Sequence, residues 1–130
     1  MYIDANIFAF AAMLPGAEGA KARKLLETVV KGRKALTSAL TIDEVMWVLR
    51  KSDRATETRT VVENIYALPN LEIKEVAASL PLRALDFMER HKLKPRDALH
   101  LAAMEQFNIH EIASDDADFD RIPGIKRMKL

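Results

Sequence analysis

Four segments of the chain place an acidic side chain directly after a strand-like apolar run or in the opening turns of a helix. The acids are Asp4, Glu44, Asp97 and one member of the Asp115–Asp116 pair. The carboxyl ends of parallel strands meet at one edge of a sheet, and neighbouring strands lie about 4.8 Å apart. We therefore expect these four carboxylates to converge in a single pocket.

A pocket of this composition favours metal chemistry. Clustered carboxylates repel one another and raise each other's pKa unless something positive sits among them. The side chains available as metal ligands are carboxylates, which are hard oxygen ligands. The chain has no cysteine, and no histidine lies obviously among the acids. This set of ligands favours Mg²⁺ or Mn²⁺ over zinc. Such a cation can activate water and neutralise a phosphodiester transition state. The cluster predicts a metal-dependent phosphodiesterase.

Each acid also has a purely structural interpretation. Asp4 would suit the N-cap of the helix that follows it, and Glu44 would complete a capping box begun at Thr41. Asp97 would offset a helix dipole, and the acidic turn after residue 113 would stabilise its own backbone. Taken singly, these interpretations are the better ones. Taken together, the common edge of the sheet favours a functional site.

Hydrophobic periodicity supplies the elements that must position the acids. Strands are predicted at Tyr2–Ile3, Lys34–Ser38, Leu71–Ile73, Glu111–Ala113 and Lys126–Met128. Helices are predicted from Asn6 to the Leu14-Pro15-Gly16 break, Ala22–Val30, Thr41–Lys51, Asp53 or Ala55 to Leu68, Ser79–His91 and Pro95–Phe107. Strands that alternate with helices predict an α/β fold, a parallel sheet covered on both faces.

Length and composition limit the classes of protein that fit. The 130 residues, 49% hydrophobic and 30% charged, predict one globular domain spanning residues 1–130. No apolar run approaches the ~20 residues of a membrane span, and we expect no signal peptide before the first strand. The absence of cysteine excludes disulfides and fits a cytoplasmic location. A net charge of +1 gives no strong overall field for nucleic acid.

The ordered set of acid-bearing segments resembles the PIN domain, and within it the VapC-type toxin ribonucleases. The segments are YIDANIF, TIDEVMWVL, KPRDALHLAAM and IASDDADFDRIPGIK, and the resemblance covers essentially the whole chain. It implies a three-layer α/β/α PIN-like fold around a parallel sheet of four to five strands. It also implies a Mg²⁺- or Mn²⁺-dependent endoribonuclease that leaves a 5′-phosphate and a 3′-hydroxyl. The implied partners are RNA, a cognate antitoxin and a second copy of the chain.

The resemblance assigns roles to individual residues. The metal-site acids of the family match Asp4, Glu44, Asp97 and Asp116. Glu44 would bind a second metal or hold and deprotonate the attacking water, and the spacing leaves one or two metals open. Asp115 crowds Asp116 and is the alternative fourth ligand. Asn6 and Ser114 match residues that support the ligands.

Four further features lie outside this set of residues. Lys94 and Arg96 border the acids and are candidates for phosphate contact. The basic cluster from Lys21 to Lys34 is either a solvated helix face or part of an RNA track. His100 stands one helical turn after Asp97, yet an isolated helix histidine favours plain core or surface. Trp47 makes its helix apolar around the circumference, which favours an oligomer contact.

Two rival functions fit parts of the same pattern. A housekeeping RNA-processing or DNA-directed nuclease would use the same acids. A catalytically silent PIN-like module would bind RNA or protein without cutting, and the presence of all four acids argues against it. A phosphatase or nucleotide-binding domain is disfavoured, because no glycine-rich phosphate loop follows the first strand.

Overall fold

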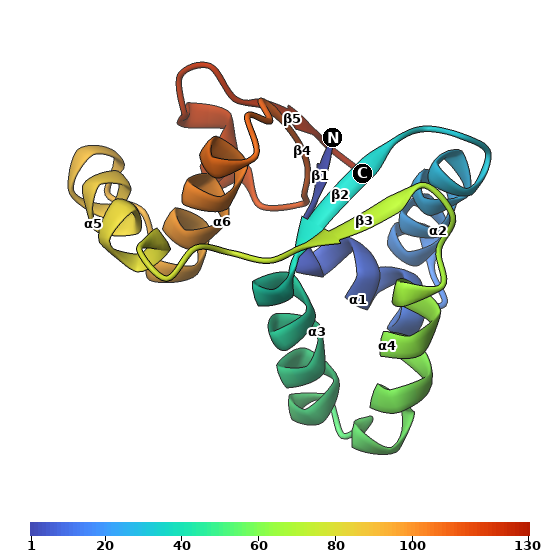
Figure 1. The fold of residues 1–130 in the computed structure, drawn as a ribbon. Coiled ribbons are helices and arrows are strands. Elements are labelled where there is room, and N and C mark those ends of the chain that lie inside the picture. The colour runs from blue at the N-terminus through green and yellow to red at the C-terminus, as the bar shows by residue number, and fades with distance from the viewer.

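The computed structural model describes residues 1–130 and contains a five-stranded sheet in the order β3-β2-β1-β4-β5 (Figure 1). Every neighbouring pair of strands is parallel. The strands are β1 (Tyr2–Ile3), β2 (Ala35–Ser38), β3 (Leu71–Lys74), β4 (Glu111–Ala113) and β5 (Lys126–Met128). The predicted parallel sheet of four to five strands is confirmed.

Helices cover both faces of this sheet and complete the three predicted layers. The α-helices are α1 (Ala5–Met13), α2 (Ala17–Val30), α3 (Ala39–Lys51), α4 (Thr58–Tyr66), α5 (Leu80–His91) and α6 (Pro95–Gln106). Two 3₁₀ turns are η1 (Ala55–Glu57) and η2 (Ala117–Arg121). In Figure 1, α5 and α6 lie on one side of the sheet and α1 to α4 on the other. None of these helices combines the length and the apolar character that a membrane crossing requires.

The short strand β1 is buried on both faces. Successive strand residues point to opposite faces, so Tyr2 packs into the cluster beneath α5 and α6, whereas Ile3 packs into the cluster beneath α1 to α4. Neither side chain is accessible to solvent. With β2 on one side and β4 on the other, β1 is the central strand of the sheet.

The strand order reverses at β1, and this reversal places the acids. The chain runs from β1 outward through β2 to β3, then returns to β4 on the other side of β1. Asp4 directly follows β1, and its backbone N–H donates to the carbonyl of Ala113, 3.1 Å away, at the end of β4. In open α/β sheets, ligands bind in the crevice at the carboxyl ends of strands where the order reverses.

Helix α3 starts two residues earlier than predicted. It begins at Ala39, with Ser38 in the N-cap position, so Thr41 lies inside the helix and is fully buried. The predicted capping box between Thr41 and Glu44 is therefore wrong. The hydroxyls of Ser38 and Thr41 instead bond the Tyr2 hydroxyl, at 2.9 and 3.0 Å, which holds the first turn of α3 against β1.

The helix predicted from Asp53 or Ala55 to Leu68 is shorter and begins with the 3₁₀ turn η1. Asp53 adopts a left-handed conformation (φ 58°) that ends α3. Arg54 then forks onto both carboxylate oxygens of Glu57, at 2.7 and 2.6 Å, and this local pairing favours the tighter turn before α4.

The junction between α1 and α2 is unusually tight at Gly19. A Cβ at this position would lie 1.9 Å from the carbonyl oxygen of Leu14, which follows α1. The same carbonyl accepts a hydrogen bond from Arg23 at 2.9 Å. Gly16, at the start of the same turn, has no heavy atom within 4 Å of such a Cβ. Only Gly19 is therefore required by close packing.

Candidate active site

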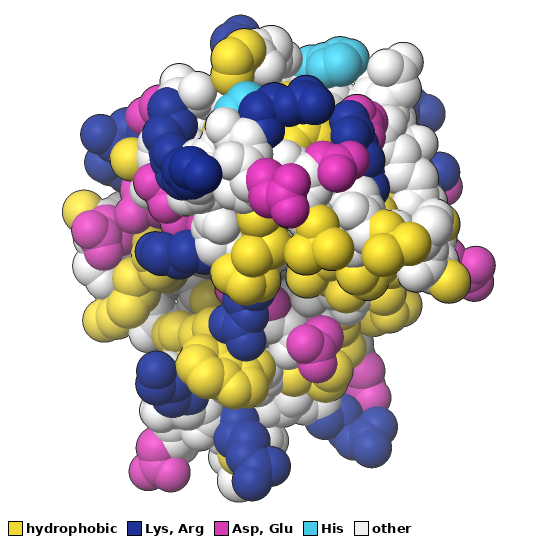
Figure 2. Space-filling model, turned by 90° about the vertical axis from the view of Figure 1, so that its left-hand side faces the viewer, with side chains coloured by type: hydrophobic (Ala, Val, Ile, Leu, Met, Phe, Trp, Pro, Cys, Tyr) yellow, Lys and Arg dark blue, Asp and Glu magenta, His cyan; other side chains and the backbone are white.

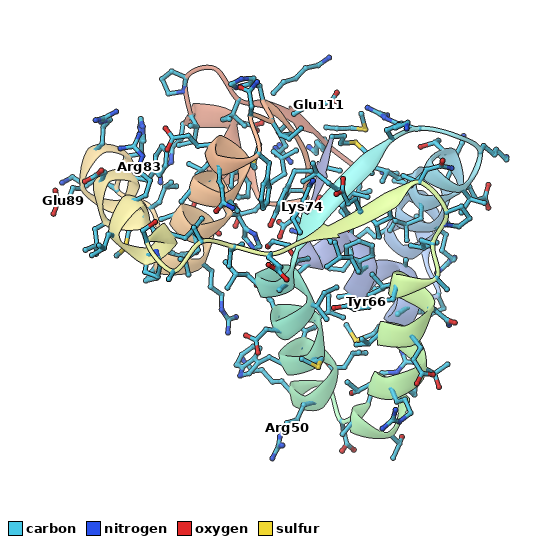
Figure 3. All side chains as sticks on the ribbon, in the orientation of Figure 1. Arg50, Tyr66, Lys74, Arg83, Glu89 and Glu111 are labelled. Carbon is cyan, nitrogen blue, oxygen red and sulfur yellow. The ribbon has the colours of Figure 1, made fainter.

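A cavity of about 160 Å³ opens at the carboxyl edge of the sheet, between α1, α3 and α6. Its polar lining consists of Asp4, Asn6, Glu44, Asp97, His100 and Asp116. Figure 3 helps to locate this edge, because it labels Lys74 at the carboxyl end of β3 and Glu111 at the amino end of β4. The four acids expected to converge all line this one cavity.

Asp4 is both a helix cap and the innermost acid of the cavity. Its Oδ1 accepts from the backbone N–H of Ala5 at 2.7 Å, so the structural interpretation of this residue holds as well. Its Oδ2 accepts from the Ser114 hydroxyl at 2.5 Å and from the Asn6 amide at 2.8 Å. Burial raises the pKa of Asp4, and the neighbouring His100 and the Ser114 hydrogen bond offset part of that rise.

Asn6 and Ser114 connect Asp4 to the acidic turn. The Asn6 amide donates to the Ser114 hydroxyl at 3.0 Å, and this hydroxyl also accepts from the backbone N–H of Asp116 at 3.0 Å. The backbone N–H of Asp115 donates to the Asn6 side-chain oxygen at 3.2 Å. Asp116 lines the cavity, whereas the side chain of Asp115 is exposed and does not.

Asp97 carries an unpartnered oxygen. Its Oδ2 is buried and has no hydrogen-bond partner. Burial, followed by the negative charges of Asp116 and Asp4, raises the pKa of Asp97 to about 6. Oxygens of Asp97, Asp116 and Asp118 lie within 4.8 Å of one another. A buried carboxylate oxygen without a donor, among other carboxylates, fits a hard divalent cation well.

Because the pKa of Asp97 is raised, we expect the free energy of unfolding of the metal-free protein to depend on pH. In the unfolded chain Asp97 ionises near its ordinary pKa, but in the folded protein only near pH 6. Its ionisation therefore costs nothing below pH 4, and the cost grows from pH 4 to pH 6 and stays constant above that. Solvent at the cavity mouth screens part of the cost, so we expect about 1–2 kcal/mol.

Thermal unfolding with a chelator present measures this cost. Asp97→Asn should melt at the same temperature as the wild type at pH 4 and about 3–6 °C higher at pH 7. A difference that does not change with pH would show that the Asp97 carboxylate is not destabilised in the fold.

His100 was left outside the predicted site but lies at its centre. The ring is only 3% exposed, with Nε2 3.1 Å from Glu44 Oε2 and 3.5 Å from Asp4 Oδ1. Its Nδ1 lies 2.9 Å from the Tyr2 hydroxyl. Burial alone would lower the pKa of His100, but the hydrogen bond to Glu44 and the nearby Tyr2 and Asp4 outweigh it and raise the pKa to about 10. The one sequence signal was its position one helical turn after Asp97.

Glu44 lies between His100 and the basic residues at the mouth of the cavity. Burial favours a higher pKa for Glu44, but the hydrogen bond and charge of His100, together with Arg96, lower its pKa overall. Arg96 Nη1 is 3.7 Å from Glu44 Oε1. Lys94 and Arg96 line an outer hollow of about 500 Å³ together with Glu44 and Asp97, so both predicted phosphate contacts border the acids.

Arg127 is a second residue that sequence reasoning did not find. Its side chain is 6% exposed although it lies on the edge strand β5. Its Nε donates to Asp120 Oδ1 at 2.7 Å, and its Nη1 donates to the Ser114 carbonyl at 3.2 Å. Arg127 therefore bonds both ends of the acidic turn, Ser114 and Asp120, and so stabilises the position of Asp116 at the cavity.

Two predicted surface features lie outside the cavity. In the basic cluster, Arg33 pairs with Glu111 at 3.0 Å, at the amino edge of the sheet and thus opposite the acids. On α3, Met46 and Trp47 are 39% and 45% exposed. Figure 2 shows hydrophobic side chains gathered in a band on the side of the molecule that carries α5 and α3. Hydrophobic side chains gathered on a surface in this way are typical of contact surfaces.

Comparison with known proteins settles the family. The sequence model of the PIN domain matches residues 1–125. The chain belongs to the PIN domain family. The family predicted from the four acid-bearing segments is thereby confirmed. This PIN domain is 28% identical to ribonuclease VapC13 of Mycobacterium tuberculosis, over 97% of each chain.

Solved structures show the same fold. Mycobacterium tuberculosis VapC20, described as a toxin that cleaves the sarcin-ricin loop, superposes on this PIN domain with a TM-score of 0.77 over 92% of each chain, at 20% identity. A chain of a toxin–antitoxin complex from Klebsiella pneumoniae superposes with a TM-score of 0.68, over 99% of this chain and 98% of that one, at 23% identity.

Proposed function

We propose that this PIN domain is an endoribonuclease that requires Mg²⁺ or Mn²⁺ and acts as the toxin of a VapBC-type toxin–antitoxin pair. The observation that carries the proposal is the convergence of four carboxylates on one cavity, with an Asp97 oxygen that has no protein partner. The similarity to a curated VapC ribonuclease over almost the whole chain supports RNA as the substrate. We place its action in the cytoplasm, where RNA substrates are abundant.

We assign the roles as follows. Asp4, Asp97 and Asp116 would hold the cation, while Glu44 would hold and deprotonate the attacking water or bind a second cation. When bound, the cation activates water and neutralises charge on the phosphodiester. Asn6 and Ser114 would act on these ligands rather than on RNA, because both hydrogen-bond Asp4.

Substrate positioning falls to the mouth of the cavity. Lys94 and Arg96 line the outer hollow beside Glu44 and Asp97, where a phosphate next to the scissile one would pass. Their charges would fix the strand by backbone contacts, which carry little sequence information. Water attack then leaves a 5′-phosphate and a 3′-hydroxyl.

The experiment that tests the function is cleavage of a panel of end-labelled single-stranded and hairpin RNAs. We expect cutting with Mn²⁺ or Mg²⁺, none with excess chelator, and product ends that carry a 5′-phosphate. Matched DNA oligonucleotides serve as the control. Cutting that persists in chelator would refute metal dependence, and preferential cutting of DNA would favour the DNA-directed alternative. Metal binding without any cutting of RNA would favour the silent binding module.

We propose that the antitoxin and a second copy of the chain bind to apolar surfaces near the cavity. A hollow of about 320 Å³ lies between α1, α2 and α4 and is lined by Phe8, Ala11, Ala12, Leu26, Val61, Asn64, Ile65 and Leu68. Other residues of the same helix α1, Phe10 and Met13 among them, line the acid cavity. An antitoxin helix seated in this hollow would reach the cavity along α1 and block it with its tail. The exposed Met46 and Trp47 are our proposed homodimer contact.

A further inference from the structure

His100 is not among the ligands or the RNA contacts assigned above, although its Nε2 lies within 4.8 Å of carboxylate oxygens of both Asp4 and Glu44. It projects from α6 toward β1 and α3, and it contacts Tyr2 with one ring nitrogen and Glu44 with the other. Tyr2 is 98 positions and Glu44 is 56 positions from His100 in the sequence. A buried polar ring that bridges three elements has a defined orientation, because each nitrogen already has a partner.

The Tyr2 hydroxyl fixes one end of the ring. This hydroxyl is itself bonded to Ser38 and Thr41, at 2.9 and 3.0 Å, so it cannot follow a rotating imidazole. The Tyr2 ring also packs edge-on against the His100 ring, with centroids 5.6 Å apart. The orientation of His100 is therefore set by β1 and the first turn of α3 and not by solvent.

The other end of the ring holds Glu44. In the neutral ring, the Tyr2 hydroxyl donates to Nδ1 and leaves the proton on Nε2; in the charged ring both nitrogens donate. In either form Nε2 donates to Glu44 Oε2, 3.1 Å away. The only other cationic contact of Glu44 is Arg96 at 3.7 Å, whose side chain is half exposed. Without His100, nothing rigid would keep this carboxylate over the cavity.

We propose that His100 is a positioning residue for the metal site, and that it holds the Glu44 carboxylate in the orientation in which it meets the cation or its water. The inference rests on the proposed metal-dependent function and adds a residue that acts through Glu44. The Tyr2 hydroxyl contributes to the same positioning, because its contact with Nδ1 fixes the orientation of the ring whose Nε2 faces Glu44.

Substitutions at residue 100 separate this role from core packing. His100→Leu keeps much of the buried volume but has no donor, whereas His100→Gln places an amide N–H near the position of Nε2. Isothermal titration with Mn²⁺, without RNA, should show affinity reduced about 10- to 100-fold for His100→Leu and no more than about 3-fold for His100→Gln. His110→Gln, at the amino edge of the sheet, is the matched histidine control and should bind like the wild type.

Nuclear magnetic resonance of the metal-free protein tests the hydrogen bond directly. We expect a slowly exchanging ring N–H signal that is absent from His100→Gln and shifted by Glu44→Gln. Tyr2→Phe should change the nitrogen shifts of the same ring while the fold is retained. In cleavage assays, His100→Leu should lower kcat and leave the KM for RNA unchanged, because RNA contacts the cavity mouth.

Four results would overturn the inference. Wild-type affinity in folded His100→Leu would show that Glu44 needs no support, and tighter Mn²⁺ binding would show that His100 competes with the cation. Equal losses in His100→Gln and His100→Leu would make His100 a ligand rather than a positioning residue. The absence of the protected ring N–H would remove the hydrogen bond itself. Failure of the wild type to bind Mn²⁺ would refute the proposed function, and the ring N–H signal would still report on the bridge.

Discussion

Asp97→Asn should reduce metal-dependent RNA cleavage about 100- to 1000-fold and leave the protein folded. The substitution keeps the shape of the side chain but removes a negative charge and one acceptor at the oxygen that has no protein partner. A cation contributes several kcal/mol to transition-state stabilisation, and each 1.36 kcal/mol is a factor of ten in rate. The fold should not suffer, because the change also relieves repulsion from Asp116 and Asp4.

The acidic turn offers a matched pair of controls. Asp116→Asn should lose activity to a similar extent, whereas Asp115→Asn should keep it, because only Asp116 lines the cavity. The variants are compared by their initial rates of cleavage of one RNA substrate at saturating Mn²⁺. Circular dichroism tests whether each variant is folded. If Asp115→Asn is the variant that loses activity, Asp115 is the fourth ligand. An active Asp97→Asn would remove Asp97 from the site altogether.

Gly19→Ala should lower the free energy of unfolding by about 2–3 kcal/mol, or about 10 °C in melting temperature. Inside a helix this substitution ordinarily stabilises by up to about 1 kcal/mol. Here the added Cβ would lie 1.9 Å from the Leu14 carbonyl oxygen, which is backbone and cannot move aside like a side chain. Helix α2 would have to shift away from α1, and the Arg23 contact with the same carbonyl would be strained.

Gly16→Ala is the control for this effect. Gly16 lies three residues earlier, in the N-cap position of α2, with open space where the added methyl group would point and no positive φ. Its replacement should cost about 0.5–1 kcal/mol, because Ala is a poorer N-cap residue than Gly. Chemical denaturation measures the free energy of unfolding of the two variants and of the wild type. Equal stability of all three would mean that α1 and α2 can separate freely at this junction.

Local patterns predicted most of the fold because they depend on near neighbours. The two last strands were predicted with their observed bounds, Glu111–Ala113 and Lys126–Met128. Pro95 marked the first turn of α6 and so placed Asp97 at the helix start. The helix ends just before Asn108, which takes a left-handed conformation (φ 54°) that Asn tolerates well. The convergence of the acids then followed from the geometry of parallel strands.

The parts that sequence reasoning did not predict are contacts between distant side chains. Thr41 reads as a helix cap in its own segment, yet its hydroxyl bonds Tyr2, 39 positions away. His100 reads as an isolated histidine until Tyr2 and Glu44 are brought to its two nitrogens. From its own segment, Arg127 would be expected to be solvated near the end of a strand. In the structure its side chain instead donates to Asp120 and to the Ser114 carbonyl, at the two ends of the acidic turn. No periodicity within one segment reports such pairings.

The central position of β1 also decides which parts of the chain must be present before the cavity can form. Asp4 precedes by 110 positions Ser114, the residue whose hydroxyl orients it. A chain still on the ribosome therefore holds its first strand without one of the two neighbours that build the cavity, and such distant pairings form late. A polypeptide that ends before the acidic turn lacks Ser114 and Asp116 and cannot assemble the proposed site. The site therefore forms only after the acidic turn has been synthesised.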